Sequence, residues 1–472
     1  MTEASQLPTV AVVLAAGRGT RMRSAKPKVL HRAAGRPLLE WVLRAAADAG
    51  CERVLAVIGH GAGAVRSTFA QAGSGPTPEW VEQLDQRGTG DALARAVTAL
   101  DAPARLLVLS GDVPLVTGST LVSLLDHAGT GWALAVAEQS SPGSLGRVIA
   151  GPDGTLARIV EAADASADEL AVRTVNAGIY VVPSAEIEPH LSNLRPSNAL
   201  GELYLTDAFT AAAEAGTQLG LFELADVDEA LGVNDRADLA RVHRLLLDRK
   251  CAELMVAGVT ILEPQRTVIE AGVAIAADTV IHPGVTLAGD TTIESGAIVH
   301  SGAWIRNARV GRDAEIGPMT VIEDSTVEAG CRVGPYARLR PGAHLGTGCR
   351  VGNFVEIKNS TFGSGVKAGH LSYLGDAEIG DRANIGAGTV TCNYDGEAKH
   401  RTEIGAGAFI GSDTMLVAPV RVGDRATTAA GSVITQDVPE GGLGVGRARQ
   451  RNLQGWADRK DRAGSKKRRS NS

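Results

Sequence analysis

The sequence predicts two different folds in one chain: an α/β domain with a mostly parallel sheet, and then a parallel β-helix. Up to about residue 232, short apolar runs alternate with longer stretches of helical spacing, which is typical of βαβ units. From about residue 259 onward, aliphatic residues recur every six residues instead, a period that neither a helix nor a plain strand produces. A chain of 472 residues is also too long for a single core.

Composition and charge fit an ordinary globular protein, with 44% hydrophobic and 21% charged residues. The 57 glycines and the scarcity of aromatic residues, at 3%, favour small repeated layers joined by tight turns. A net charge of −6 gives no sign of a nucleic-acid partner over the folded part. The basic run near the C-terminus, within residues 456–472, is expected to be a disordered, solvated tail.

Cysteine usage and the N-terminus indicate a cytoplasmic protein without a membrane partner. The five cysteines are scattered, odd in number and free of CxxC pairs. They therefore suggest neither a zinc knuckle nor a complete disulfide framework. A reducing compartment is the simpler interpretation. The first apolar run, Val10–Ala16, is too short for a membrane span, and no basic segment precedes it.

The first half of the chain is expected to alternate strands with helices. Strands are predicted at Val10–Leu14, Val54–Ile58, Leu106–Leu109 and Leu134–Val136, and helices at Leu38–Ala49 and Asp91–Leu100. An amphipathic helix follows over 234–258, with apolar residues at Leu239, Val242, Leu246 and Leu254. The predicted organisation is therefore a domain over 1–232, a linker helix over 233–258, a β-helix over 259–455 and a tail over 456–472.

The six-residue period is sustained over many steps and identifies the second domain. It runs through Ile275, Ile281, Leu287, Ile293, Val299 and Ile305, through Val310, Ile316 and Ile322, through Val333, Leu339, Leu345, Val351 and Ile357, and through Ile404, Ile410, Leu416 and Val422. Such a period fits a β-helix in which each six-residue face points one aliphatic side chain inward. Ile385 and Ile404 are 19 residues apart, which no multiple of six matches, so a projecting loop is expected over Thr389–Arg401.

A glycine turn follows the first strand. The segment from Leu14 to Met22 contains Gly17 and Gly19, whose backbone N–H groups can approach phosphate oxygens closely. Lys28 lies just beyond this turn, and no Walker sequence is present. The pattern therefore indicates a phosphate cradle.

These residues resemble the signature of sugar-1-phosphate nucleotidyltransferases. Further matches are Gln83 to Gly90, Gly111 to Leu115, Gly146-Arg147, Ile159 to Glu161, Asn176 to Gly178 and Gly232 to Asn234. Together with the repeats, the chain from about Val10 to Trp456 is similar to the bacterial bifunctional N-acetylglucosamine-1-phosphate uridyltransferase / glucosamine-1-phosphate acetyltransferase family. The resemblance implies a Rossmann-like nucleotidyltransferase domain joined by a helical arm to a left-handed parallel β-helix. It also implies a role in supplying UDP-N-acetylglucosamine for peptidoglycan and other cell-envelope polysaccharides.

For the first domain, the resemblance implies transfer of uridylyl from UTP to N-acetylglucosamine 1-phosphate. Both substrates are anions, so cations and alignment matter more than a protein nucleophile. Arg21 and Lys28 are expected to act on the phosphates, and Asp112 and Asn234 to hold Mg²⁺. By resemblance, Gln83, Gly88 and Thr89 are expected to contact uracil or ribose, and Gly146, Glu161 and Asn176 to hold the N-acetylglucosamine. The full set expected to bind UTP or the UDP-sugar is Leu14, Ala15, Ala16, Gly17, Lys28, Gln83, Gly88, Thr89, Gly146, Glu161, Asn176 and Asn234.

For the second domain, the resemblance implies acetyl transfer from acetyl-CoA to the amine of glucosamine 1-phosphate. An amine with a pKa of about 7.7 is substantially protonated at neutral pH, so a base is needed. His370 occupies the family's base position. Arg340 and Lys358 are 18 residues apart, or three hexads, which stacks them one coil apart on one face.

The family positions also predict the remaining contacts. Arg340 and Lys358 are expected to bind the sugar phosphate, with Tyr373 and Asn384 as further sugar contacts, and Lys399 lies at a family binding position too. The residues expected to bind acetyl-CoA are Ala387, Asn393, Tyr394, Ser412, Ala430 and Arg447. The resemblance further implies a homotrimer formed through the β-helix, with each acetyltransferase site built from different chains.

Two other interpretations remain open at this point. The chain could be a nucleotidyltransferase whose β-helix only oligomerises or regulates; the combination of His370, Arg340 and Lys358 argues against this, because a purely structural solenoid has no need of it. It could also be a non-enzymatic interaction protein that keeps both folds as scaffolding. Such a protein would be expected to lack Asp112, Lys28 or the glycine turn, and all of these are present.

Overall fold

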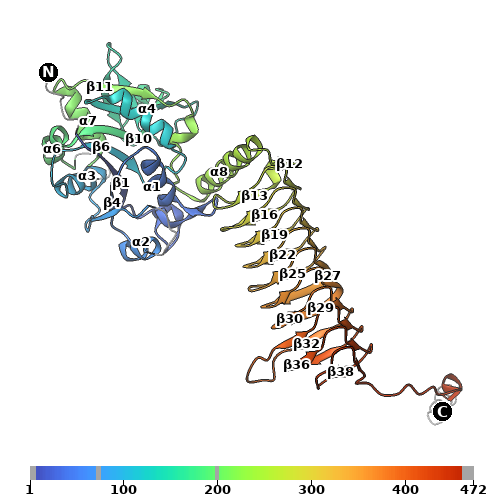
Figure 1. Ribbon diagram of the computed structural model, residues 1–472. Coiled ribbons are helices and arrows are strands. Elements are labelled where there is room, and N and C mark those ends of the chain that lie inside the picture. Colours follow the sequence, from blue (N-terminus) through green and yellow to red (C-terminus); the bar gives the residue numbers. More distant parts are fainter. Residues whose placement is uncertain (1–6, 71–75, 197–200, 460–472) are drawn as a thin grey trace, which may run out of the picture. The chain divides into compact units, whose positions relative to one another are not determined.

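The computed structural model describes residues 7–70, 76–196 and 201–459 (Figure 1). The chain divides into two compact units, Met1–Lys250 and Cys251–Ser472. Most of the basic tail expected at the C-terminus, residues 460–472, lies outside the described residues.

The first unit is built on a mixed β-sheet. Its strands, in spatial order, are β11 (Leu219–Glu223), β7 (Trp132–Glu138), β10 (Thr174–Pro183), β6 (Arg105–Ser110), β1 (Thr9–Ala15), β4 (Arg53–Ile58) and β5 (Glu79–Glu82). Strands β6, β1, β4 and β5 are parallel neighbours, whereas β10 runs antiparallel to both β6 and β7. The sheet expected to be mostly parallel therefore carries one reversed strand near its middle. A β-ribbon, β8 (Arg147–Ala150) and β9 (Leu156–Val160), attaches to β10.

Two hydrophobic cores lie on opposite faces of this sheet. Along β1, Ala11 and Val13 belong to one core and Val10 and Val12 to the other, because successive side chains of a strand point to opposite faces. The helices of this unit are α1 (Leu38–Asp48), α2 (Ala62–Phe69), α3 (Thr89–Thr98), α4 (Gly118–Ala128), α5 (Ala167–Leu170), α6 (Ser184–Ser192) and α7 (Leu205–Glu214). Helices α1, α2 and α4 pack against the first core, and α3, α6 and α7 against the second.

A longer helix, α8 (Arg236–Val256), follows the first unit's sheet, and the division between the units falls within it. The buried residues Val242, Leu246 and Leu254 recur on one side of this helix, as the apolar spacing predicts.

The second unit consists of stacked coils, each made of three short strands. The first face holds β12 (Thr260–Ile261), β15 (Val280–Ile281), β18 (Ile298–Val299), β21 (Glu315–Ile316), β24 (Arg332–Val333), β31 (Asn384–Ile385), β34 (Phe409–Ile410), β37 (Thr427–Thr428) and β39 (Leu443–Gly444). The second face holds β13 (Val268–Ile269), β16 (Thr286–Ala288), β19 (Trp304–Arg306), β22 (Val321–Glu323), β25 (Arg338–Leu339), β32 (Val390–Cys392), β35 (Met415–Val417) and β38 (Val433–Ile434). The third face holds β14 (Ala274–Ile275), β17 (Thr292–Ile293), β20 (Arg309–Val310), β23 (Thr326–Val327), β26 (His344–Leu345), β28 (Thr361–Phe362), β30 (Ala377–Ile379), β33 (Thr402–Ile404) and β36 (Val420–Val422). Two longer strands, β27 (Arg350–Lys358) and β29 (Lys367–Gly375), continue from the first face to the second.

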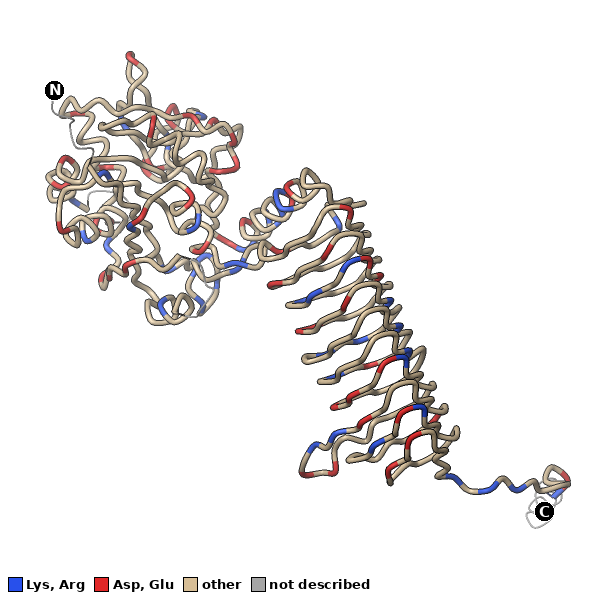
Figure 2. The backbone as a smooth tube through the Cα atoms, in the orientation of Figure 1, with Lys and Arg blue, Asp and Glu red and all other residues tan. Residues whose placement is uncertain are grey.

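This arrangement is the left-handed parallel β-helix that the sequence predicts. Residues of the six-residue series, such as Ile316, Leu339 and Leu345, are fully buried in one continuous core, while Ile275 at the start of the series packs against it only partly buried. Partners in neighbouring coils are 18 or 17 residues apart, as in the pairs Thr286–Trp304 and Thr292–Arg309. Figure 2 shows basic and acidic residues interspersed along these coils.

The expected loop is present, but it begins later than predicted. Ala377 pairs with Thr402, a separation well above the usual 18, so additional residues must leave the coil here. The predicted range began at Thr389, yet Val390–Cys392 still forms strand β32 and pairs with β35. The projecting segment is therefore 393–401, closed by a bridge between Tyr394 and Lys399. The hexad count detects the surplus residues but cannot tell where they leave the coil.

None of the helices in the described ranges is both long and apolar enough to cross a membrane.

Stability of the second unit should depend on its inward aliphatic residues. We expect Leu339→Ala, which empties a fully buried position, to lower the free energy of unfolding by about 2–5 kcal/mol. Val433→Ala, at a half-exposed position of the same sheet, should change it by less than about 0.5 kcal/mol. Urea unfolding followed by circular dichroism measures both. Equal decreases in the free energy of unfolding of the two variants would contradict an inward-pointing Leu339 side chain.

Candidate active sites

The first unit contains a cavity of about 700 Å³ at the carboxyl ends of β1 and β6, the edge where α/β sheets bind ligands. The two strands are neighbours, with Leu14 opposite Ser110, and the Gly111 N–H donates to the Leu14 carbonyl at 2.9 Å. Predicted residues that line the cavity are Leu14, Ala15, Ala16, Gly17, Lys28, Gln83, Gly88, Thr89 and Asp112.

The glycine turn brings Lys28 into this cavity. Gly19 has a left-handed backbone, with φ of 60°, and a Cβ on it would lie 2.6 Å from the Lys28 Cβ. No larger residue fits there, so glycine allows the lysine to lie directly against the turn. The Lys28 ammonium forms an ion pair with the Asp112 carboxylate. The cation expected to act on phosphate thus lies beside the carboxylate expected to hold Mg²⁺.

The two predicted metal ligands converge on Gly232. A Cβ on Gly232 would lie 4.0 Å from Asp112 Oδ2 and 3.9 Å from Asn234 Nδ2. Arg21 donates to Asn234 Oδ1 at 2.8 Å. Within the described ranges, no group of three or more His, Cys, Asp or Glu side chains is arranged to hold a metal. Mg²⁺ usually binds one or two carboxylates and completes its shell with substrate phosphates and water, which suits a site with Asp112 and Asn234 as its protein ligands.

Gln83 is buried and positions the loop that borders the cavity. Its amide donates to the Gly88 carbonyl at 2.9 Å and to Asp91 Oδ2 at 2.7 Å. Gly88 has φ of 117° and packs against the Leu203 backbone, where a Cβ would collide. Thr89 accepts a hydrogen bond from the Leu205 N–H at 2.9 Å. The predicted nucleoside contacts therefore form one hydrogen-bonded wall of the cavity.

The three predicted sugar contacts form a separate group: Gly146 directly precedes β8, Glu161 directly follows β9, and Asn176 lies on β10. The Asn176 N–H donates to the Gly146 carbonyl at 2.9 Å, and a Cβ on Gly146 would lie 3.3 Å from Glu161 Oε2. Glu161 accepts from the Thr206 hydroxyl at 3.1 Å. Burial raises the pKa of the Glu161 carboxyl above its ordinary value.

In the second unit, His370 lies in a cavity of about 490 Å³ on the first face of the β-helix. The predicted residues Asn384, Ala387 and Ser412 line the same cavity. His370 Nδ1 is 2.8 Å from Asn353 Oδ1, directly below it in the register of β27 and β29. Because an amide oxygen can only accept, Asn353 holds the proton on Nδ1 and leaves the Nε2 lone pair available as a base.

A second group of predicted residues lies on the neighbouring face. The Arg340 N–H donates to the Ile357 carbonyl at 2.8 Å, which places Arg340 and Lys358 one coil apart, as the spacing predicts. Lys399, from the projecting loop, lies beside Lys358 and holds the pKa of that ammonium below its ordinary value. Arg340 pairs with Glu356 at 2.8 Å. The clustered cations suit an anionic phosphate.

Tyr373 and Asn393 belong to this second group. Both side chains lie against Gly375, where a Cβ would collide with them, and Asn393 donates to Asp376. None of Arg340, Lys358 and Tyr373 is among the described residues that line the His370 cavity. A single chain therefore brings the predicted acetyltransferase residues together as two groups, one on each side of a corner of the β-helix.

The last predicted acetyl-CoA residues lie farther along the coils. Ala430 adjoins Gly431, where a Cβ would lie 4.0 Å from Arg447 Cδ. Tyr394 is exposed in the loop, and its hydroxyl donates to the Gly396 carbonyl. The described residues that line the His370 cavity do not include Ala430, Arg447 or Tyr394.

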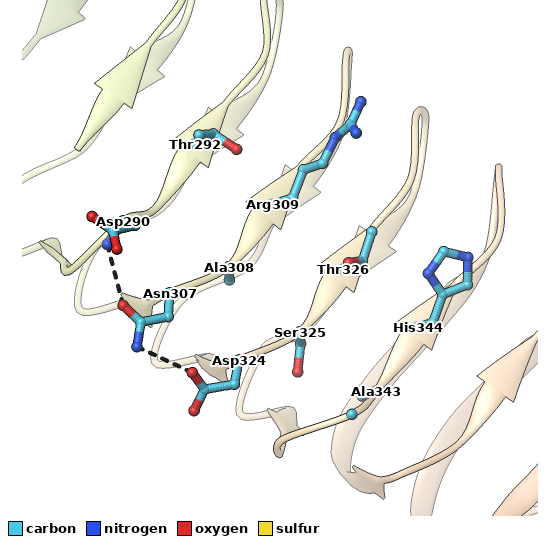
Figure 3. Close-up of a pocket in the computed structure, with 11 residues that line it drawn as sticks. Asp290, Thr292, Asn307, Ala308, Arg309, Asp324, Ser325, Thr326, Ala343 and His344 are labelled. Atoms are coloured by element: carbon cyan, nitrogen blue, oxygen red, sulfur yellow. Dashed lines mark hydrogen bonds between the residues drawn. The ribbon is translucent and has the colours of Figure 1, made fainter. Parts of the chain in front are cut away.

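A third cavity, of about 480 Å³, lies along the third face and contains none of the predicted residues (Figure 3). Asn307 Nδ2 donates to Asp324 Oδ1 at 3.1 Å, and the Asp290 N–H donates to Asn307 Oδ1 at 3.2 Å. These groups form a ladder that ties successive coils together at a corner. Asn307 and Asp324 both have left-handed backbones there, with φ of 48° and 44°.

Comparison with known proteins agrees with both units. A model of the MobA-like NTP transferase domain matches residues 11–207, and the bacterial transferase hexapeptide model matches residues 324–359 and 401–436. The chain is 46% identical to the bifunctional protein GlmU of Pelobacter propionicus over 94% of this chain and 97% of that protein. It is 46% identical to the bifunctional protein GlmU of Stutzerimonas stutzeri, over 94% and 98% of the two chains.

The chain belongs to the bifunctional GlmU family. It is accordingly an enzyme with a nucleotidyltransferase unit and a hexapeptide-repeat transferase unit, and these fit the uridylyl and acetyl transfers of UDP-N-acetylglucosamine synthesis. UTP and acetyl-CoA are the matching substrates.

Several residues of these cavities were not selected from the sequence. Asn353 carries no motif of its own; only the pairing of neighbouring coils, 17 residues apart, could have identified it as the partner of His370. Ser110, Gln86 and Glu202 line the first cavity. Ser110 could have been found from its position at the end of a buried strand before Gly111-Asp112.

The contact between His370 and Asn353 should matter for acetyl transfer. We expect Asn353→Ala to lower the kcat of acetyl transfer by about 10-fold or more, because the imidazole loses the partner that fixes its tautomer. Uridylyl transfer should be unchanged. Asn353→Asp, which keeps an acceptor oxygen, should retain more activity than the alanine variant. Equal activities of the two variants in a thiol-release assay would contradict a positioning role.

The buried carboxyl of Glu161 gives a second prediction. Its folded-state pKa lies above the ordinary value, so its contribution to stability is present at low pH and is lost as the pH rises through that pKa. Glu161→Gln should therefore not lower the melting temperature at pH 7, while it raises the KM for N-acetylglucosamine 1-phosphate. A lower melting temperature with an unchanged KM would show that Glu161 has a structural role instead.

Proposed function

We propose that this chain makes UDP-N-acetylglucosamine in two steps at two separate sites. The second unit acetylates glucosamine 1-phosphate, and the first unit couples the product to UTP. The observation that carries the proposal is that each unit has its own cavity, one beside Lys28 and Asp112 and one beside His370. The product would supply peptidoglycan and other cell-envelope polysaccharides.

In the first unit, the phosphate oxygen of N-acetylglucosamine 1-phosphate attacks the α-phosphorus of UTP. The bond between that phosphorus and the β-phosphate oxygen breaks, and pyrophosphate leaves. Lys28 and Arg21 exchange their contacts with Asp112 and Asn234 for the phosphate oxygens and stabilise the developing charge. The wall of Gln83, Gly88 and Thr89 holds the nucleoside in the cavity that Leu14, Ala15, Ala16 and Gly17 of the cradle also line. The separate group of Gly146, Glu161 and Asn176 holds the sugar.

Asp112 and Asn234 would hold Mg²⁺. Their carboxylate and amide oxygens are the hard ligands that this ion prefers, and both side chains lie round Gly232. The ion would neutralise charge on the phosphates of UTP.

In the second unit, His370 Nε2 takes a proton from the amine of glucosamine 1-phosphate as its nitrogen attacks the acetyl carbonyl. The carbon–sulfur bond of the thioester then breaks, and the departing thiolate of CoA takes the proton that His370 received from the amine. Arg340, Lys358 and Lys399 hold the sugar phosphate, while Tyr373 and Asn384 contact the sugar. Acetyl-CoA is bound by Ala387, Asn393, Tyr394, Ser412, Ala430 and Arg447, and a backbone N–H group stabilises the oxyanion.

We further propose a cytoplasmic homotrimer formed through the β-helix. Asn384 lies on the first face, whereas Arg340, Lys358 and Tyr373 lie beyond the corner on the second. A second chain can bring its own Asn384 to these residues, which supports a shared site. The functional division is proposed to follow residues 1–232 and 259–455, with 233–258 as the linker.

The two-site proposal predicts that each activity can be abolished without the other. His370→Ala should lower acetyl transfer by about 100-fold or more, because a general base contributes roughly 10²–10⁴-fold, and should leave uridylyl transfer intact. Asp112→Ala should do the reverse. Release of thiol and of pyrophosphate measures the two activities on the same samples. If each change reduced both activities equally in folded protein, the proposal would be wrong.

A further inference from the structure

Three basic side chains form a group beside the glycine turn but outside the cavity that Lys28 lines. They are Lys26, two residues before Lys28, then Arg32, and Arg236, two residues after Asn234, and we call them the cationic cluster. None of the three is among the described residues that line that cavity. Partial desolvation, followed by the charges of Arg32 and Arg236, holds the pKa of the Lys26 ammonium below its ordinary value. Both arginines therefore lie close enough to Lys26 for their charges to act on it.

Arg236 is fixed by two hydrogen bonds. Its Nε donates to the Met22 carbonyl at 3.2 Å, and its Nη1 lies 3.3 Å from His31 Nδ1. Because an arginine side chain always keeps its proton, His31 Nδ1 must accept, and the imidazole is neutral. Burial of His31, followed by the charges of Arg236 and Lys26, lowers the pKa of the imidazole and favours this neutral form. Arg236 itself is exposed, and its other N–H groups have no hydrogen-bond partner among the described residues.

Lys26 and Arg32 also extend from a fixed backbone. The residue after Lys26, Pro27, packs against Gly61, which has φ of 70° and where a Cβ would lie 2.5 Å from Pro27 Cγ. Arg32 Nη1 donates to the Gly35 carbonyl at 2.5 Å. Both basic side chains are exposed. A ligand would therefore find the cations held in place, which reduces the ordering cost of binding.

The cationic cluster has no counter-charge within the part of the chain that the structure describes. The neighbouring Arg36 pairs with Glu40, but no carboxylate among the described residues forms an ion pair with a member of the cluster. The carboxylates of Asp235 and Asp238 instead accept from backbone N–H groups around the start of helix α8. Cations held together without a counter-charge repel one another, and a bound anion removes this repulsion.

We propose that the cationic cluster is a second anion site, which binds pyrophosphate after it leaves the Lys28 cavity. Pyrophosphate is small and multiply charged, so a group of ammonium and guanidinium donors matches it. A nucleic acid would need a longer basic surface, and the chain has a net charge of −6.

The position of the cluster favours the same ligand. The reaction proposed for the first unit releases pyrophosphate at Lys28 and Arg21, and the cluster adjoins Lys28 and Asn234 along two segments of the chain. Pyrophosphate would move from the cavity to the cluster without any covalent change. The cavity could then accept another UTP while pyrophosphate is still bound. This inference rests on the proposed function and deepens it, because it adds a site for the product of uridylyl transfer.

The test measures pyrophosphate binding while UTP fills the cavity. Full-length protein is given Mg²⁺, saturating UTP and radiolabelled pyrophosphate without any sugar, so that no reaction takes place, and equilibrium dialysis measures the bound label. We expect the wild type to bind one pyrophosphate per chain. K26Q/R32Q should bind it about 10-fold or more weakly, because two charge-assisted contacts are lost. Its affinity for UTP should stay at the wild-type value.

Two control variants separate the cluster from overall charge. K26R/R32K keeps both cations and should retain most of the pyrophosphate affinity. R66Q/R241Q removes two exposed arginines of the same unit that pair with Glu82 and Asp228, and should bind pyrophosphate as the wild type does. A loss in R66Q/R241Q as large as that in K26Q/R32Q would reduce the effect to net charge and overturn the inference.

The remaining outcomes distinguish this site from the proposed function. If the wild type binds no pyrophosphate once UTP is saturating, or if K26Q/R32Q binds it as tightly as the wild type, the second site does not exist, although uridylyl transfer stands. If K26Q/R32Q loses affinity for UTP instead, the cluster belongs to the UTP site, and the inference fails. If folded protein binds pyrophosphate at the cluster but never forms UDP-N-acetylglucosamine from UTP, the anion site stands and the proposed function is refuted.

Discussion

The constant length of a β-helix face is the constraint on which the second unit depends. Most faces carry one inward aliphatic residue, so the coils keep nearly the same perimeter and stack in register. Residues 17 or 18 positions apart therefore become neighbours. This stacking places Asn353 beneath His370 and Arg340 beside Lys358, although neither pair is close in the sequence. The same constraint forces surplus residues out of the coil, and the loop that results carries Lys399 back to Lys358.

The first unit obtains its site from a different constraint, the common edge at which parallel strands end. Strands β1 and β6 are in register, so the glycine turn after one and Asp112 after the other must meet. Phosphate transfer needs this kind of edge, where backbone N–H groups, cations and a carboxylate converge. Acetyl transfer needs a positioned base and a groove for a long cofactor, which a stack of uniform coils can provide. Each reaction is therefore matched to a fold: phosphate transfer to the edge of the sheet, and acetyl transfer to the stacked coils.

Most of both folds could be predicted from the sequence, because both constraints produce recurring patterns of apolar residues. The six-residue series identifies the inward residues, and the apolar runs locate β1, β4, β6 and β7 within one or two residues. The hexads do not say at which corner a face ends, so they could not show that Tyr373 and Asn384 lie on opposite sides of one. They also placed the loop too early, because Val390–Cys392 follows the pattern of an ordinary strand. Asn353 was missed because its role exists only between coils.

The central claim is that one chain holds two reaction centres that work independently, and one measurement tests it directly. Purified full-length protein is given glucosamine 1-phosphate and acetyl-CoA without UTP, and phosphorus NMR follows the sugar phosphate. The account predicts complete conversion to N-acetylglucosamine 1-phosphate, and then formation of UDP-N-acetylglucosamine and pyrophosphate once UTP and Mg²⁺ are added. Acetylation that begins only after UTP is added, or no acetylation by folded protein, would contradict the account.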